Sequence, residues 1–225
     1  MSKTSRIWRL GWLVVCIVLA SASTRAQSDK PLKFEVAAAF TTITEPSYDG
    51  GRTEPGFGGR FTFNLNRSVA VEAEGNFFPH KCRSCGRGIY GDSNGNISQG
   101  LFGIKAGKRF QKWGIFAKGR PGVVSFSQGD AKYVQTGTTG VFPFEFQHKR
   151  LTNFAFDLGG VLEFYPSRRI VTRFDAGDTL IHYRERTSNY FSYNTLTGPG
   201  VLVPFTLRAE TRHNFQFSAS VGFRF

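Results

Sequence analysis

The sequence has 225 residues, of which 26 are glycine, 24 are phenylalanine and one is methionine. This length suits a single all-β domain, and the glycine and aromatic content favours strands over a helical bundle. A mean hydropathy of −0.25 excludes a polytopic helical membrane protein, which needs several apolar runs of about 20 residues, and the 15% of aromatic residues argues against disorder.

The first 26 residues have the pattern of a cleaved signal peptide. Three basic residues precede an apolar run at 13–22, and small residues occupy the −3 and −1 positions of a cleavage site before Gln27. An N-terminal anchor is the alternative, but the run is short for a membrane span. We expect residues 27–225 to form one exported domain. Its formal charge falls from +13 to +9, because residues 1–26 carry four bases and no acid, and no nucleic-acid partner is expected after export.

From Pro31 onward, apolar and polar residues alternate with a period of two, which is typical of strands with two different faces. The clearest example is 214–225, where a phenylalanine, alanine or valine occupies every second position. Eight strands are expected, at 32–43, 57–65, 69–77, 100–108, 113–125, 154–164, 169–183 and 214–225. Pro121 lacks a backbone N–H, so it is expected at a bulge or a rim.

The connections between these strands alternate in length. Those near 66–68, 108–112 and 166–169 are short, whereas those at 44–56, 79–99, 127–151 and 184–212 are long. Transmembrane barrels have short turns at one end and long loops at the other. The pattern therefore predicts an all-β fold, namely an eight-stranded antiparallel up-and-down transmembrane β-barrel.

Charged residues lie opposite the apolar face of the expected strands. In a membrane barrel they would fill the interior, whereas in a soluble sandwich, the alternative, they would face water. Neighbouring strands tend to carry opposite signs, which favours cross-strand pairs, and eight strands enclose a space that side chains can fill. The acids are Glu35, Glu72, Glu74, Asp157, Glu163 and Asp175, and the bases are Lys33, Arg60, Lys105, Lys118, Arg120 and Arg173. Trp113, Tyr165 and Tyr183 are expected in aromatic belts at the membrane interfaces.

The signal peptide, the eight alternating segments and the C-terminal run 215–225 resemble the small outer-membrane β-barrel family of the OmpA/OmpX type. The run 157–166, followed by 173–177, is also similar to the last-hairpin region of such barrels. The resemblance implies a monomer in the outer membrane, in contact with its lipid and lipopolysaccharide. It also implies that the barrel-insertion machinery reads an assembly signal, which corresponds to Phe217, Ala219, Val221, Phe223 and Phe225.

The second long loop contains Cys82 and Cys85 in a Cys-x-x-Cys spacing. A loop disulfide is the favoured interpretation in an oxidising compartment, and a zinc site, free thiols or cross-links between chains are the alternatives. The glycines of 86–91 match the spelling of a dinucleotide fingerprint, but the strand and helix that this motif requires are missing. No cofactor is therefore expected.

Histidines and basic residues concentrate in the long loops and at the rims. His182 with Ser188, or His213 with Glu210, could be drawn as parts of a catalytic triad, but solvent-exposed rim histidines are the favoured interpretation. The loop bases would either contact lipopolysaccharide phosphates or be solvated. They are Lys81, Arg83, Arg87, Lys149, Arg150, Arg184, Arg186, Arg208 and Arg212. The aromatic segments 141–146 and 189–193 are interpreted as strand extensions or as a contact surface for a partner.

The sequence thus predicts a non-enzymatic barrel with a plugged interior, which stabilises the envelope or acts in surface adhesion through its long loops. A lipid A-modifying (acyl-chain) enzyme in the same barrel is the alternative. A pore is disfavoured because paired charges would fill the interior.

Overall fold

The computed structural model describes residues 32–45, 52–79, 95–135, 144–192 and 201–225, and these form ten β-strands. The strands are β1 (Phe34–Glu45), β2 (Arg52–Asn64), β3 (Val69–Phe78), β4 (Ile97–Arg109), β5 (Trp113–Gln135), β6 (Phe144–Phe164), β7 (Ile170–Tyr183), β8 (Arg186–Ser192), β9 (Val201–Leu207) and β10 (Glu210–Arg224). No helix in these ranges is long and apolar enough to cross a membrane. The expected signal peptide lies outside the described residues.

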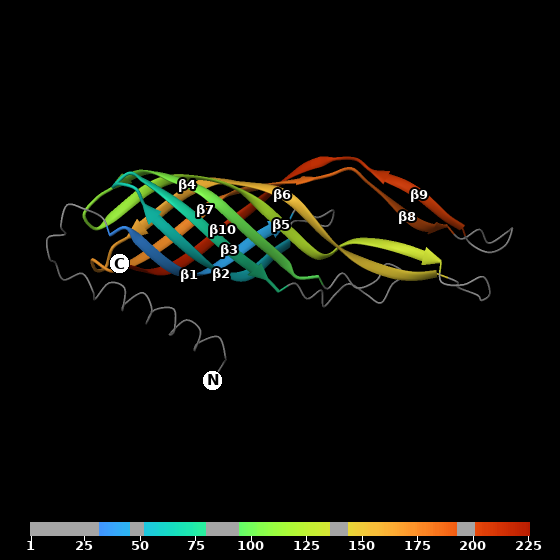
Figure 1. Cartoon of the computed structure of the whole chain (residues 1–225), viewed down its shortest axis with the longest axis horizontal. Coiled ribbons are helices and arrows are strands. Elements are labelled where there is room, and N and C mark those ends of the chain that lie inside the picture. Colours follow the sequence, from blue (N-terminus) through green and yellow to red (C-terminus); the bar gives the residue numbers. More distant parts are fainter. Residues whose placement is uncertain (1–31, 46–51, 80–94, 136–143, 193–200) are drawn as a thin grey trace, which may run out of the picture.

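Eight of the strands form a closed barrel, which Figure 1 shows from the side. Strands β1 to β7 and β10 follow one another around it in chain order, each antiparallel to its neighbours. The barrel closes where β1 pairs with β10, and the backbones of Phe34 and Phe225 exchange hydrogen bonds of 3.0 and 2.9 Å at the end of this seam. The predicted eight-stranded antiparallel barrel is confirmed.

Three tight turns join the strands at one end of the barrel, which we call the short-turn end. In the first, the Asn66 side chain accepts hydrogen bonds from the backbone N–H groups of Ser68 and Val69, at 2.7 and 2.8 Å. Ser167 accepts similar bonds from Arg169 and Ile170 in the third turn. Side-chain oxygens that bond the backbone two or three residues ahead stabilise such turns. The β6–β7 hairpin that contains the third turn is not the last hairpin of the barrel, because β10 follows β7 around the sheet.

At the opposite, long-loop end, several strands run well beyond their predicted limits (Figure 1). Strands β5 and β6 contain 23 and 21 residues and pair with each other out to Gln135 and Phe144, and β8 and β9 form a separate hairpin. The expectation that 127–151 and 184–212 are loops was therefore wrong for the described residues 127–135, 144–151, 186–192, 201–207 and 210–212. The two strands of a hairpin satisfy each other's backbone groups, so the ladder continues where the closed sheet ends. Residues 144–146 and 189–192 are thus strand extensions, while 141–143 and 193 lie outside the described residues.

Pro121 lies in the interior of β5, opposite Phe156 of β6. Pairing of β5 with β4 is interrupted between Leu101–Gly122 and Ile104–Gly119, and it resumes in the same register. The expected bulge or rim position was therefore wrong. The missing donor is accommodated by a local gap in the ladder.

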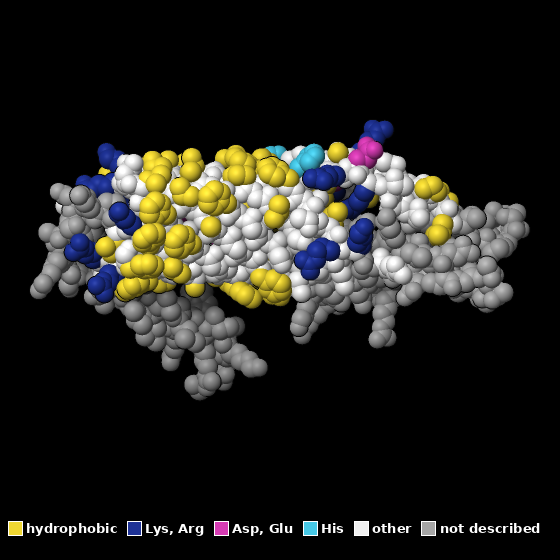
Figure 2. Space-filling view, in the orientation of Figure 1, with side chains coloured by type: hydrophobic (Ala, Val, Ile, Leu, Met, Phe, Trp, Pro, Cys, Tyr) yellow, Lys and Arg dark blue, Asp and Glu magenta, His cyan; other side chains and the backbone are white. Residues whose placement is uncertain are grey.

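The polarity of the barrel wall is inverted relative to that of a water-soluble protein. Large apolar side chains point outward, and Phe57, Phe102 and Val221 are 61%, 62% and 59% exposed. Figure 2 shows these side chains gathered in a band near the short-turn end, with Lys and Arg on both sides of it. Soluble monomers rarely expose an apolar surface of this extent. The band instead suits contact with lipid hydrocarbon.

Candidate functional site: the charged barrel interior

The inward face of the barrel carries a cluster of charged side chains. Eleven of the twelve charges that were predicted to lie in the interior are at most 4% exposed. The exception is Lys33, which is exposed. The eleven are Glu35, Arg60, Glu72, Glu74, Lys105, Lys118, Arg120, Asp157, Glu163, Arg173 and Asp175. The alternation of each strand places them on one side, and closure of the sheet brings them together.

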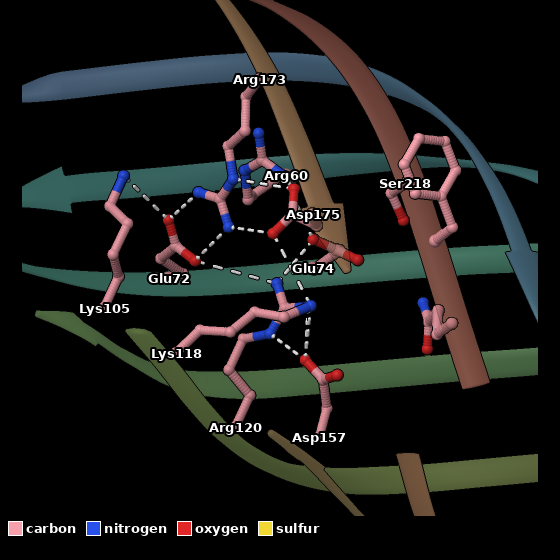
Figure 3. Close-up of polar contacts among 12 residues, drawn as sticks. Arg60, Glu72, Glu74, Lys105, Lys118, Arg120, Asp157, Arg173, Asp175 and Ser218 are labelled. Carbon is pink, nitrogen blue, oxygen red and sulfur yellow. Dashed lines mark hydrogen bonds and ion pairs between the residues drawn. The ribbon is translucent and has the colours of Figure 1, made fainter. Parts of the chain in front are cut away.

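Arg173 lies at the centre of this cluster, between Glu72 and Asp175 (Figure 3). Its guanidinium donates two hydrogen bonds to the Glu72 carboxylate, one of them 3.0 Å long, and two more to Asp175 at 2.6 and 2.9 Å. Glu72 also accepts from Thr62 at 3.3 Å and lies 3.3 Å from Lys105 Nζ. Arg173 therefore links β3 to β7 across the interior.

Arg120 makes a second junction, between Glu74 and Asp157 (Figure 3). It donates to Glu74 at 2.6 Å and to Asp157 at 2.8 Å. Lys118 Nζ lies 3.0 Å from Asp157 and 3.6 Å from Asp175, so this junction is joined to the Arg173 group. Arg60 adds a contact to Glu74 at 3.4 Å.

Two cations that the sequence reasoning missed complete the cluster at the short-turn end. Arg224 lies 3.0 Å from Glu35 and 3.3 Å from Glu163, and Arg109 lies 3.6 Å from Glu163. Arg224 is separated by an even number of residues from the inward-facing Ser218 and Ser220, so the alternation of the strand could have predicted its inward position. Lys33, in contrast, is exposed, because it precedes β1, which begins at Phe34.

Tyr165 was expected in an aromatic belt but is buried, at 6% exposure. Its hydroxyl donates to Glu163 at 2.8 Å and accepts from Arg109 at 3.0 Å. Burial and the neighbouring Glu163 carboxylate raise the pKa of Tyr165, so the phenol remains a donor. Two residues after Glu163, Tyr165 has inward parity, which excludes it from the lipid face. Trp113 is 40% exposed and remains at the rim.

Lys105 contacts both Glu72 and Glu163 and so joins the short-turn group to the rest, which places every acid of the cluster in one network. Six carboxylates, Glu35, Glu72, Glu74, Asp157, Glu163 and Asp175, face six buried bases, Arg60, Lys105, Lys118, Arg120, Arg173 and Arg224, with Arg109 at the edge. A buried charge without a partner is strongly destabilising, so the balance between the signs is what allows such an interior to exist. We call these thirteen residues the ion network.

A layer of uncharged polar side chains lies between the ion network and the long-loop end. Gln99 donates to Gln216 at 3.0 Å, and Asn76 donates to Gln99 at 2.7 Å. Thr41 accepts from Ser218 at 2.8 Å. Beyond this layer, six buried apolar residues pack together as a plug: Ile43, Phe78, Ile97, Val124, Ala155 and Ile181. Ion network, polar layer and plug together fill the interior with side chains.

The triads drawn from the sequence do not form. His213 Nδ1 lies 2.5 Å from Asp178 Oδ2, while Glu210 pairs with Arg212. His182 contacts Thr211 at 3.1 Å, and Ser188 belongs to the separate β8–β9 hairpin. Both histidines are exposed on the outer wall of the barrel.

Other residues singled out by the sequence are divided between described and undescribed segments. Cys82, Cys85, His80, Lys81, Arg83 and Arg87 lie outside the described residues. Lys149, Arg150, Arg184, Arg208 and Arg212 are exposed near the long-loop end, and Arg186 is half-buried. Within the described ranges, no three His, Cys, Asp or Glu side chains are grouped as a metal site would require.

Comparisons with known proteins identify relatives of the fold but not of the sequence. No protein-family model matches the chain, and no curated protein has a significantly similar sequence. The crystal structure of neisserial surface protein A matches with a TM-score of 0.50 and 12% identity, over 85% of this chain and 97% of the other.

Two further structures match less closely. The N-terminal β-barrel domain of Pseudomonas aeruginosa OprF has a TM-score of 0.44 and 9% identity, over 87% and 99% of the two chains. The attachment invasion locus protein Ail of Yersinia pestis, in complex with a heparin analogue, has a TM-score of 0.47 and 11% identity, over 88% and 100%. The chain has the fold of the small eight-stranded outer-membrane β-barrels, as represented by neisserial surface protein A.

Proposed function

We propose that this protein is a non-enzymatic, monomeric scaffold of the outer membrane that holds two hairpins above the lipid for surface contact. The observation that carries the proposal is the contrast between the two parts of the molecule. The interior is occupied by the ion network and the apolar plug, so we expect that solutes do not pass through the described part of the barrel. The chain beyond the closed barrel, in contrast, forms two hairpins, namely the β5–β6 extension and β8–β9.

The proposed partners follow from the same arrangement. The outward apolar band would contact lipid, and the exposed bases near the long-loop end would contact lipopolysaccharide phosphates through charge-assisted hydrogen bonds. The outward aromatic residues Phe217, Phe223 and Phe225 would be recognised by the barrel-insertion machinery during assembly. Adhesion and envelope stabilisation both fit this scaffold, and the hairpins favour adhesion.

The test is to delete residues 186–207, so that Glu185 joins Arg208, and to compare cells that produce the full chain, the deletion variant or neither. Adherence to an epithelial monolayer is measured together with sensitivity to SDS, after heat-modifiable migration has verified that both barrels are folded. We expect the deletion to abolish adherence and to leave SDS sensitivity unchanged. If adherence is the same with and without the hairpin, and cells that lack the barrel are more sensitive to SDS, the function is envelope stabilisation and not adhesion.

A lipid A-modifying enzyme is the competing function. It is disfavoured because His213 contacts Asp178 while Glu210 contacts Arg212, and because His182 contacts Thr211 while Ser188 lies in the separate β8–β9 hairpin. Mass spectra of lipid A from cells with and without the protein are expected to contain the same acyl chains. A difference of one acyl chain would favour the enzyme.

A further inference from the structure

Exposed charges are distributed unequally between the two ends of the barrel. At the short-turn end, six exposed side chains are cationic: Lys33, Arg67, Lys108, Lys112, Arg168 and Arg169. Among the described residues, no exposed Asp or Glu lies at this end, where Glu35 and Glu163 are fully buried in the ion network. At the long-loop end, exposed bases are interspersed with acids such as Glu185 and Glu210.

The six cations are spread around the barrel. Arg67 lies in the turn between β2 and β3, Lys108 and Lys112 flank the turn between β4 and β5, and the adjacent pair 168–169 lies in the turn between β6 and β7. Lys33 precedes β1, on the remaining side of the circle. Figure 2 shows the Lys and Arg side chains of this end directly beside the apolar band. We call the six residues the short-turn collar.

Aromatic rings fix the depth of the short-turn collar relative to the apolar band. Trp113 stacks on Phe110 with ring centroids 4.2 Å apart, and Lys108 Nζ lies 5.4 Å from the centroid of the Phe110 ring. Near Lys33, Phe34 and Phe225 stack at 5.8 Å. Aromatic side chains of this kind occupy the boundary between hydrocarbon and headgroups. Long basic side chains beside them extend to the level of the lipid phosphates.

We propose that the short-turn collar binds the headgroups of anionic phospholipids in the leaflet around it and retains these lipids in preference to zwitterionic ones. Guanidinium and ammonium groups donate charge-assisted hydrogen bonds to phosphate oxygens. A zwitterionic headgroup offers the same phosphate but adds a cation that the collar repels. The buried carboxylates of this end are already neutralised within the ion network, so exposed bases outnumber the exposed Asp and Glu side chains among the described residues that face the lipid here.

The test uses the full chain folded in vesicles of phosphatidylcholine with a minor fraction of phosphatidylglycerol. Spin-labelled versions of the two lipids report, by electron paramagnetic resonance, the preference of the lipid shell around the protein. One basic group near an anionic surface changes local affinity by about fivefold, and the shell average is expected to favour phosphatidylglycerol by at least about twofold at low salt. At 1 M NaCl, where screening acts within about 3 Å, the preference should largely disappear.

The decisive variant combines Lys108→Gln, Lys112→Gln, Arg168→Gln and Arg169→Gln. All four side chains are exposed, so the barrel should keep its heat-modifiable migration. The ratio of phosphatidylglycerol to phosphatidylcholine affinity should fall to nearly one. Gln111→Ala, next to Lys112 in the turn between β4 and β5, is the matched control and should keep the wild-type ratio.

Three outcomes would overturn the proposal. The first is a wild-type preference near one, and the second is a quadruple variant that keeps the wild-type value. The third is an equal loss of lipid preference when Arg208→Gln and Arg212→Gln are made at the long-loop end, because the preference would then not depend on which end of the barrel carries the bases. If the quadruple variant keeps its lipid preference but no longer binds purified peptidoglycan sacculi, the collar faces the cell wall and not lipid.

Discussion

Replacement of Arg173 by methionine tests whether the buried charges stabilise the barrel as partners. Arg173 is fully buried and donates two hydrogen bonds each to Glu72 and Asp175. Arg173→Met leaves these carboxylates with weaker partners, Lys105 at 3.3 Å and Arg60 at 3.5 Å. Removing one member of a buried pair costs about 3–5 kcal/mol. Because both carboxylates keep a partner, we expect a loss of about 3 kcal/mol in the free energy of unfolding.

The loss is measured by urea unfolding of the protein in lipid vesicles. Trp113 is the single tryptophan of residues 27–225, and its fluorescence reports the transition. With a slope of about 2 kcal/mol per molar urea, the midpoint should fall by about 1.5 M. The double variant Arg173→Met/Glu72→Leu restores the balance of charge, and we expect a favourable coupling energy of about 1–3 kcal/mol between the two sites.

Arg212→Met is the matched control, because Arg212 also pairs with an acid, Glu210, but is about half exposed, at 47%. Such surface pairs contribute about 0–1 kcal/mol, so its midpoint should stay close to that of the wild type. If Arg173→Met costs no more than Arg212→Met, the interior charges are hydrated and the proposed ion network does not stabilise the fold.

Three further outcomes are expected. Gly159→Ala should destabilise the barrel by about 1–3 kcal/mol, because the new Cβ would lie 2.3 Å from the Ala176 carbonyl oxygen. Gly160→Ala, which has open space around it, should be nearly neutral in the same urea titration. Equal effects of the two substitutions would contradict the packing around Gly159. In planar bilayers the purified protein should carry no steady current, since side chains fill the interior, and regular conductance steps would reveal a pore. Cys82 and Cys85 should resist alkylation until a reductant is added, and labelling of both without reductant would exclude the loop disulfide.

Alternation in the sequence predicted most of the barrel because each strand has one face toward lipid and one toward the interior. In β10, for example, the exposed Phe215, Phe217 and Phe223 alternate with the buried Gln216 and Ser218. The limits of the strands were less predictable. Hairpin pairing beyond the closed sheet needs only a partner strand, so β5 and β6 continue through residues with no clear alternation.

The members of the ion network could be predicted from parity, but their connections could not. Pairs on adjacent strands, such as Arg60 with Glu74, follow from register. Contacts across the interior, such as Lys105 with Glu163 or Arg224 with Glu163, depend on strand tilt and on how far long side chains extend. The errors at Lys33 and Tyr165 arose at strand ends, where parity alone does not define the surroundings of a side chain.

The orientation of the outward phenylalanine-rich face in a bilayer is the claim on which the other proposals depend. It is tested most directly with spin labels on β10, attached at Phe217→Cys, Ala219→Cys and Val221→Cys in a Cys82→Ser/Cys85→Ser background. At all three sites we predict strong relaxation by oxygen, which concentrates in hydrocarbon, and weak relaxation by a water-soluble nickel chelate. A label at Lys149→Cys, an exposed position near the long-loop end, should respond in the opposite way. If the β10 labels relax with the nickel chelate as strongly as the label at 149, that face is in water and the barrel does not span a membrane.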